Sequence, residues 1–328
     1  MLSNSFMTKE AITIVTPVYN DWTSFKHLVE EVDRCLNNLE FDVTIIAVDD
    51  GSSQTSPVMG EIAQKLNTIR RIEILHLSRN IGHQRAIAIG LSYVEKNCKS
   101  DGIVVMDADG EDSPDTLPAL IAELHKSNRI VFARRGNRRE NRIFLLFYHI
   151  YRSLFFVLTG KWITFGNYSV IPGNLLKRVV FLPEIWNHFA AGIMRAEIPQ
   201  TTLLISRGSR YAGKSKMNFV GLILHGLSAI SVYADILAVR LILFTAAIIF
   251  STIIGSIVML YIRFFTDLAI PGWATSVALG LGIILFQALM FLSMISFLVL
   301  NSRSTQMFIP FQHYEDFLLA KETIYEQS

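Results

Sequence analysis

Residues 102–115 have the sequence GIVVMDADGEDSPD, in which a short apolar run ends in a cluster of carboxylates. Similar β-rich runs recur through the first 135 residues, and together with this one they lie at 11–16, 43–49, 71–77, 102–107 and 129–133. The segments between them have amphipathic, helical patterns and lie at 22–38, 57–67, 83–97 and 115–127. Apolar runs that are separated by helical patterns predict βαβ units, and therefore an α/β fold with a mostly parallel sheet.

Polar residues follow four of these expected strands at their carboxyl ends. They are PVYN at 17–20, DDGSS at 49–53, SRN at 78–80 and DAD at 107–109. Ligands bind at the carboxyl ends of the strands in such sheets, so the four loops predict a site at one edge. The sequence contains neither the glycine fingerprint of a dinucleotide-binding fold nor a Walker-type phosphate loop, which disfavours both of those folds.

The composition is more apolar than that of a water-soluble domain. Of the 328 residues, 51% are hydrophobic and 18% are charged, against about 25% charged residues in average soluble domains. The low charge, with 19 Gly and 9 Pro, excludes disorder and a collagen-like chain, and the net charge of +2 argues against nucleic acid as a partner. Cys35 and Cys98 lie far apart without metal-like spacing, which indicates reduced thiols on the cytosolic side.

The apolar excess is concentrated in two stretches of the C-terminal third. Residues 241–262 contain no charge and lie between Arg240 and Arg263, and residues 273–300 form a second uncharged stretch. Each is long enough to cross a hydrocarbon core of about 30 Å as a helix. We therefore predict a transmembrane hairpin of two helices. The alternative is a buried hairpin in a soluble protein.

The N-terminal residues do not have the pattern of a secretory signal peptide, because Lys9 and Glu10 precede an apolar run that is too short. We therefore expect the first domain and both termini on the cytosolic side of the membrane. The distribution of Lys and Arg around the two spans agrees with this only weakly. The expected segments are a domain at 1–215, a juxtamembrane amphipathic helix at 216–239, the spans within 240–302 and a tail of unassigned role at 303–328.

A basic and aromatic segment follows the fifth expected strand. Residues 126–152 contain eight Lys or Arg and one acid, Glu140, and they overlap the apolar run FLLFYHIYRSLFFVL at 144–158. Basic residues beside an apolar aromatic helix are typical of a helix that lies in an anionic membrane interface. We expect such an interfacial helix at 141–160. The alternative is a helix packed in the protein core.

The order of these motifs resembles that of glycosyltransferase family two, whose members have the Rossmann-like GT-A fold. SRNIGHQRA at 78–86, MDADGEDSPD at 106–115 and RYAGKSKMNF at 210–219, followed by two spans, are similar to the polyprenyl-phosphate glycosyltransferases, which include dolichyl-phosphate mannose synthase and bactoprenol glucosyltransferase. The resemblance implies a membrane-bound, inverting enzyme. Such an enzyme moves one sugar from a UDP- or GDP-linked donor to a polyprenyl phosphate, here at the cytosolic face of a bacterial inner membrane.

The residues expected to bind the nucleotide sugar are Pro17, Tyr19, Asp21, Val48, Asp50, Asp107 and Ala108. A carboxylate at a strand end can accept hydrogen bonds from a base or from ribose hydroxyls, which suits Asp50 and Asp107, and the resemblance implies Pro17, Tyr19, Asp21 and Val48. Asp49 either shares this pocket or forms the turn around Gly51. His83 is expected to pack or cap at a helix start, and Arg79 to face the sugar or the diphosphate.

A divalent cation is expected beside the DAD motif. If the strand continues through Asp107 and Asp109, their side chains alternate, so that one contacts ribose and the other a metal. Carboxylate oxygens suit Mg²⁺ or Mn²⁺, either of which would stabilise a diphosphate leaving group. The resemblance implies that Asp109 and Glu111 hold this metal. Asp112 is either a general base or a favourable negative charge near the start of the next helix.

The expected ligands of the acceptor phosphate are Arg134, Arg210 and Lys216. A lipid phosphate is already anionic near neutral pH, so it needs cations to position it and no base. Matching family positions touch the phosphates of donor or acceptor, and the alternative for Arg210 and Lys216 is contact with lipid headgroups.

Residues 166–169, GNYS, depart from the Gly-Asp-Phe-Arg of many bactoprenol-type relatives, which puts the acceptor or sugar pocket in doubt. Two rival functions stay open. One is transfer to a neutral lipid hydroxyl, which requires a general base, and the other is a non-catalytic membrane scaffold. Assembly into a homo-oligomer is also left open.

Overall fold

The structure is a computed structural model, and it describes residues 9–37, 39–56, 60, 64–136, 142–206, 208–211, 219–268 and 270–327. The chain forms two compact units. The first comprises Met1–Tyr151, Trp162–Val232 and Phe308–Ser328, and the second comprises Arg152–Lys161 and Tyr233–Met307.

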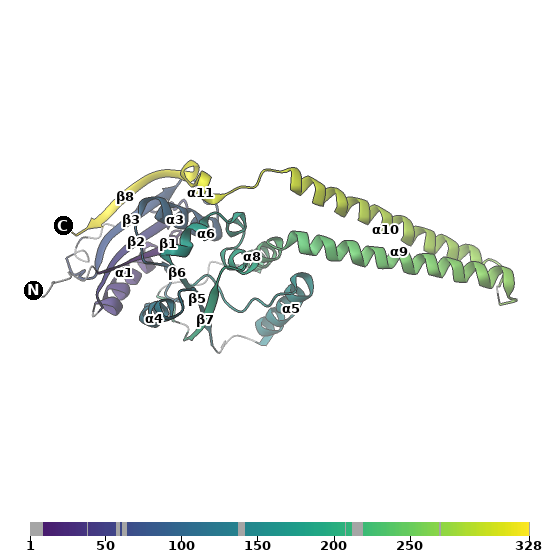
Figure 1. Cartoon of the computed structure of the whole chain (residues 1–328), viewed down its shortest axis with the longest axis horizontal. Helices are drawn as coiled ribbons and strands as arrows, with labels where there is room; N and C mark the ends of the chain where they lie inside the picture. Colours follow the sequence, from purple (N-terminus) through teal and green to yellow (C-terminus); the bar gives the residue numbers. More distant parts are fainter. Residues whose placement is uncertain are drawn as a thin grey trace, which may run out of the picture. The chain divides into compact units, whose positions relative to one another are not determined.

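The first unit is built on an eight-stranded sheet with the order β7-β5-β6-β4-β1-β2-β3-β8 (Figure 1). The strands are β1 Glu10–Val18, β2 Phe41–Asp49, β3 Ile69–Leu77, β4 Gly102–Val105, β5 Ile130–Arg135, β6 Ser169–Pro172, β7 Gln200–Ile205 and β8 Leu318–Glu326. The central strands β4, β1, β2 and β3 are parallel, as expected, whereas β6 and β8 run antiparallel to their neighbours. All five predicted strands are confirmed. The unpredicted strands β6, β7 and β8 join them, and the sheet is mixed because β6 and β8 run antiparallel to their neighbours.

Helices cover both faces of this sheet. The helices on one face are α1 Trp22–Leu36 and α4 Leu117–Ser127, and those on the other are α3 His83–Asn97, α6 Gly173–Val180 and α7 Phe189–Arg195. There is a hydrophobic core on each face of the sheet, and side chains alternate between the two along β1. Ile12 and Ile14 lie in the core under α1, and Val15 lies in the core under α3. Close packing against α3 requires Gly90, where a Cβ would lie 2.5 Å from Val15.

Shorter helical segments complete the first unit: η1 Pro114–Thr116, η2 Pro183–Trp186, α8 Phe219–Ser231, α11 Pro310–His313 and η3 Tyr314–Phe317. Helix α5, Arg142–Thr159, begins in the first unit and ends in the second. The helix expected over 57–67 lies largely outside the described residues. The tail, to which the sequence assigned no structure, supplies β8 at the outer edge of β3 (Figure 1).

The second unit contains the two long helices α9 Ala234–Phe265 and α10 Trp273–Ser304, which pack against each other. Each has 32 residues and is therefore about 48 Å long, more than a bilayer core requires. In the most apolar 18-residue segment of each helix, only 11% and 6% of the residues are buried. A helical hairpin in the core of a soluble protein would be mostly buried. Both helices are candidate membrane spans, and both extend beyond the predicted limits of 241–262 and 273–300.

The C-terminal half of α5 belongs to the second unit and has two different sides. Phe155 is fully buried and stacks edge-on against Tyr233 at the start of the second unit's helical region, with ring centroids 5.8 Å apart. Leu154, Phe156 and Val157 are exposed. This part of the helix therefore combines features of both alternatives raised by the sequence, since one residue packs inside the protein and the others present an apolar surface.

Candidate active site

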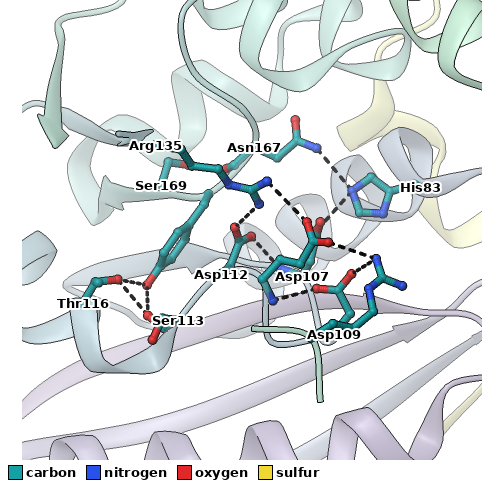
Figure 2. Close-up of polar contacts among 12 residues, drawn as sticks. His83, Asp107, Asp109, Asp112, Ser113, Thr116, Arg135, Asn167 and Ser169 are labelled. Carbon is teal, nitrogen blue, oxygen red and sulfur yellow. Dashed lines mark hydrogen bonds and ion pairs between the residues drawn. The ribbon is translucent and has the colours of Figure 1, made fainter. Parts of the chain in front are cut away.

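Four carboxylates lie in the loop that follows β4, at the carboxyl edge of the sheet: Asp107, Asp109, Glu111 and Asp112. The strand ends at Val105, so the expected alternation of Asp107 and Asp109 on an extended segment is wrong. A turn replaces it, in which Gly110 has φ 89° and the backbone N of Glu111 donates to Asp109 Oδ1 at 2.9 Å. The turn brings the side chains of Asp107, Asp109 and Asp112 close together (Figure 2).

A second loop, residues 208–211, lies directly against this turn. The backbone N of Gly208 donates to Glu111 O at 3.1 Å, and the backbone N of Tyr211 donates to Asp109 O at 2.9 Å. A Cβ on Gly208 would lie 2.1 Å from the carbonyl oxygen of Gly110, so the two backbones approach this closely only because residue 208 is glycine. Residues 208–211 are therefore held in a fixed place beside the acidic loop.

This contact brings Arg210 to the carboxylates. Its Nη2 atom lies 2.6 Å from Asp109 Oδ2 and 3.4 Å from Glu111 Oε1. Arg210, which is expected to bind the acceptor phosphate, thus lies next to both residues expected to hold a metal. Lys216, expected to act with Arg210, lies outside the described residues.

The second cation at the site is Arg135, which was not predicted from the sequence. Its Nη2 lies 2.9 Å from Asp112 Oδ1 and its Nη1 lies 3.4 Å from Glu111 Oε2 (Figure 2). Arg134, the residue that was expected here, is exposed on the same strand. Side chains alternate along β5, so only one of two neighbouring arginines can face the carboxylates. The alternation of side chains along the strand could have identified Arg135 from the sequence, but only if the register of β5 had been known.

Asp112 holds the acidic loop together. Its carboxylate is 2% exposed, and it accepts hydrogen bonds from Arg135 at Oδ1 and from the backbone N of Asp107 at Oδ2, the latter at 3.0 Å. Burial, followed by the nearby Asp107 charge, raises the pKa of Asp112 to about 7. Burial, followed by the Asp109 charge, likewise raises the pKa of Asp107 to about 7.

His83 lies beside Asp107 of the acidic loop, and Asn167 lies beside His83. His83 Nε2 lies 3.3 Å from Asp107 Oδ1 and 3.2 Å from Asn167 Nδ2 (Figure 2). Desolvation lowers the pKa of His83 although three neighbouring carboxylates act in the opposite direction. His83 is the first residue of α3, so its predicted position at the start of a helix is confirmed.

Tyr168 anchors the segment after the acidic loop. It is 3% exposed, its hydroxyl donates to Ser113 O at 3.0 Å, and it lies 2.8 Å from Thr116 Oγ1. Burial raises its pKa well above the usual range. Tyr168 therefore has a structural role in the GNYS stretch, while Asn167 is the residue of that stretch that reaches the site.

The loop after β2 is held by its own acidic residues. Asp49 Oδ1 accepts a hydrogen bond from Ser52 N at 2.9 Å, so it forms the turn around Gly51 that was one of its two expected roles. Asp50 is 4% exposed and accepts from Ile81 N at 2.7 Å and from Gly82 N at 3.0 Å. Its pKa is raised by burial, which outweighs these two bonds.

The first strand contributes the PVYN loop to the same edge. Asn20, at φ 50°, accepts at Oδ1 from Ser53 N at 2.9 Å, and its own backbone N donates to Ser52 Oγ at 2.8 Å. Tyr19 is 45% exposed, whereas Val48 is fully buried in the core under α3. The other residues expected to line a nucleoside pocket, Pro17, Asp21 and Ala108, lie at the ends of β1 and β4, and Ala108 is buried.

Two other features of the described residues do not coincide with this edge. A cavity of about 370 Å³ lies at the amino ends of β1, β2 and β3 and is lined by, among others, Arg71, Glu73 and Tyr93. Ligand atoms of Glu31, Cys35 and Asp115 lie within 4.8 Å of one another, but Arg34 already pairs with both carboxylates. Burial also raises the pKa of the Cys35 thiol to about 12, so it is a poor metal ligand.

Residues 13–185 match the family model described as glycosyl transferase family 2. The chain belongs to this family. It is 28% identical, over 67% of either chain, to undecaprenyl-phosphate 4-deoxy-4-formamido-L-arabinose transferase of Proteus mirabilis. It is 27% identical, over 82% of either chain, to the uncharacterized glycosyltransferase YkcC of Bacillus subtilis. Among solved structures, mannosyl-3-phosphoglycerate synthase of Rubrobacter xylanophilus matches 69% of this chain and 73% of that chain, with 15% identity and a TM-score of 0.47.

Family membership confirms the resemblance and identifies the protein as a glycosyltransferase. The mixed sheet with helices on both faces is the GT-A-type fold that the resemblance implied. The acidic loop after β4 lies inside the matched region, while Arg210, the candidate spans and β8 follow it.

Proposed function

We propose that the protein is a membrane-bound, inverting glycosyltransferase that moves one sugar from a UDP- or GDP-sugar to a polyprenyl phosphate at the cytosolic face of a bacterial inner membrane. The observation that carries this proposal is the meeting of Asp109 and Glu111 with Arg210 at the carboxyl edge of the sheet. Such an arrangement can bind a cation and a phosphate side by side. The candidate spans and the name of the Proteus mirabilis relative support a lipid phosphate as acceptor.

Asp109 and Glu111 fit a divalent cation. Both carboxylates already share one cationic group, the Arg210 guanidinium, and oxygen ligands of this kind suit Mg²⁺ or Mn²⁺. A bound metal would stabilise the negative charge that develops on the diphosphate leaving group. With a metal held by these carboxylates, the Arg210 guanidinium would be able to pair with a phosphate oxygen instead.

The donor nucleoside is assigned to the loops after β1, β2 and β4. Tyr19 offers an exposed aromatic face, Asp50 offers oxygen lone pairs beyond its bonds to Ile81 and Gly82, and Asp107 offers a carboxylate beside the metal ligands. Pro17, Asp21, Val48 and Ala108 are proposed to shape the same pocket through their backbone or their packing.

The hydrogen bonds of the Asp112 carboxylate support a phosphate acceptor over a hydroxyl acceptor. A neutral lipid hydroxyl needs a general base, whereas a lipid phosphate attacks as an anion. Both oxygens of Asp112 are already engaged, by Arg135 and by the backbone of the acidic loop, so this residue is proposed to position the loop. Arg210 and Lys216 remain the proposed ligands of the acceptor phosphate, whereas Arg134 does not face the carboxylates and is not placed with them.

The test is release of nucleotide by the full chain in nanodiscs with Mn²⁺ and a panel of UDP- and GDP-sugars. Each donor is assayed with undecaprenyl phosphate, with undecaprenol and without lipid. Release that requires the lipid phosphate supports the proposal, and equal release with undecaprenol supports a hydroxyl acceptor. No release with any combination would contradict an enzyme of this specificity. Asp109→Asn, which is nearly isosteric, should lose most of the metal-dependent turnover.

A further inference from the structure

The C-terminal strand places a carboxylate beside the loop that follows β2. Strand β8 pairs antiparallel with β3, with Ala320 opposite His76. Glu322, two residues along β8, accepts a hydrogen bond from Ser56 Oγ at 2.8 Å, and its Oε2 also lies 3.2 Å from His76 Nε2. One side chain of the tail therefore contacts both β3 and the far end of the loop.

His76 continues this chain of contacts to the near end of the loop. Its other ring nitrogen, Nδ1, lies 2.9 Å from Asp49 Oδ2. Asp49 is the last residue of β2, and its second oxygen accepts from Ser52 N inside the loop. Glu322 thus reaches residues 49–56 twice, directly at Ser56 and through His76 at Asp49.

Residues 49–56 depend on such contacts because little apolar packing holds them. Ser53, Gln54 and Thr55 are exposed, while Asp49 at the start of the loop is buried. Segments with few buried apolar contacts open locally at low free-energy cost, so the polar contacts that they make determine how often they open. Asn20 contacts residues 52–54 in the middle of this loop, while the contacts at its two ends converge on a residue about 270 positions further along the chain.

We propose that Glu322 is a positioning residue, through which the C-terminal strand holds residues 49–56 in the conformation that binds the donor nucleoside. The ligand in this statement rests on the proposed function, whereas the coupling of tail and loop rests on the contacts alone. In sequence, β8 follows the second candidate span, α10.

The coupling is tested by hydrogen–deuterium exchange of the full chain in detergent, without any ligand. Glu322→Ala should raise exchange of the amides of residues 50–56 several-fold while the acidic loop at 107–113 stays at the wild-type rate. Glu322→Gln, which keeps an acceptor, should have a smaller effect, and Glu326→Ala, which removes an exposed carboxylate from the same strand, should have none. Unchanged exchange in the loop, or an equal rise through all strands, would overturn the coupling.

The consequence for the donor is tested by titration calorimetry with UDP and with GDP, each with Mn²⁺, together with steady-state kinetics. Loss of one or two hydrogen bonds should raise the Kd for the nucleotide and the KM for its sugar roughly three- to tenfold in Glu322→Ala, with kcat nearly unchanged. A fall in kcat with an unchanged Kd would overturn positioning of the donor. If the wild type binds neither nucleotide, the proposed function fails, and the exchange experiment still decides the coupling.

Discussion

The guanidinium of Arg210 lies 2.6 Å from Asp109, on a loop that is 101 residues further along the chain. The same nitrogen reaches Glu111, so one cation satisfies both carboxylates that the proposal assigns to the metal. A charged group that must be displaced before a ligand can bind weakens the binding of that ligand. Arg210 is therefore expected to compete with the metal while the nucleotide is absent.

Arg210→Gln should accordingly bind Mn²⁺ more tightly than the wild type in the absence of nucleotide, by roughly tenfold, because a competing charge–charge hydrogen bond is removed. The measurement is Mn²⁺ titration followed by electron paramagnetic resonance. The same variant should transfer sugar more slowly, since a phosphate ligand is lost. Arg129→Gln, which removes an exposed arginine elsewhere, is the control. Weaker Mn²⁺ binding in Arg210→Gln would contradict the competition.

Arg135→Gln should lower the free energy of unfolding by roughly 1–3 kcal/mol, because the buried Asp112 carboxylate would lose a hydrogen-bonding partner. Arg134→Gln, at the neighbouring exposed position, should change it by less than about 0.5 kcal/mol. Chemical denaturation of the two variants compares them directly. Equal effects of both substitutions would show that the register of β5 differs from the one described.

Gly208→Ala should displace residues 208–211 from the acidic loop, since its Cβ would lie 2.1 Å from the carbonyl oxygen of Gly110. The contact of Arg210 with Asp109 would be lost, and sugar transfer should fall at least about tenfold. The matched control is Gly282→Ala in α10, which belongs to the second unit, because no described atom lies within 4 Å of the Cβ that it adds. Nucleotide release by both variants is the measurement. Full activity of Gly208→Ala would mean that this loop can move without consequence.

The metal-free protein should lose stability as the pH rises from about 5 to 7. Burial raises the pKa of Asp107 and of Asp112 to about 7 in the folded state, whereas an unfolded Asp titrates near 4. Between these values the folded state binds protons that the unfolded chain releases, so stability is greatest at the acid end and falls with increasing pH. Thermal unfolding in EDTA at several pH values measures this. Asp112→Asn should flatten the dependence, and Asp316→Asn, an exposed carboxylate, should leave it unchanged.

Local sequence patterns predicted the elements whose residues are neighbours in the chain. The five strands around the acidic edge and the helices at 22–36 and 83–97 follow from periodicity, because each buries one face against the sheet. The two long apolar helices follow from length and lack of charge alone. The carboxylates after β4 could be named as a site because parallel strands end at one edge.

Tertiary structure decided which charges meet there. The choice of Arg135 over Arg134 depends on the register of β5, and the place of Arg210 depends on two glycine backbones in contact. The role of the tail depends on the pairing of β8 with β3, between residues about 250 positions apart. These contacts join distant segments, and their energies depend on geometry that exists only once the sheet has formed. Residue type and spacing therefore identify the chemistry available at the edge, and folding determines which partner each group receives.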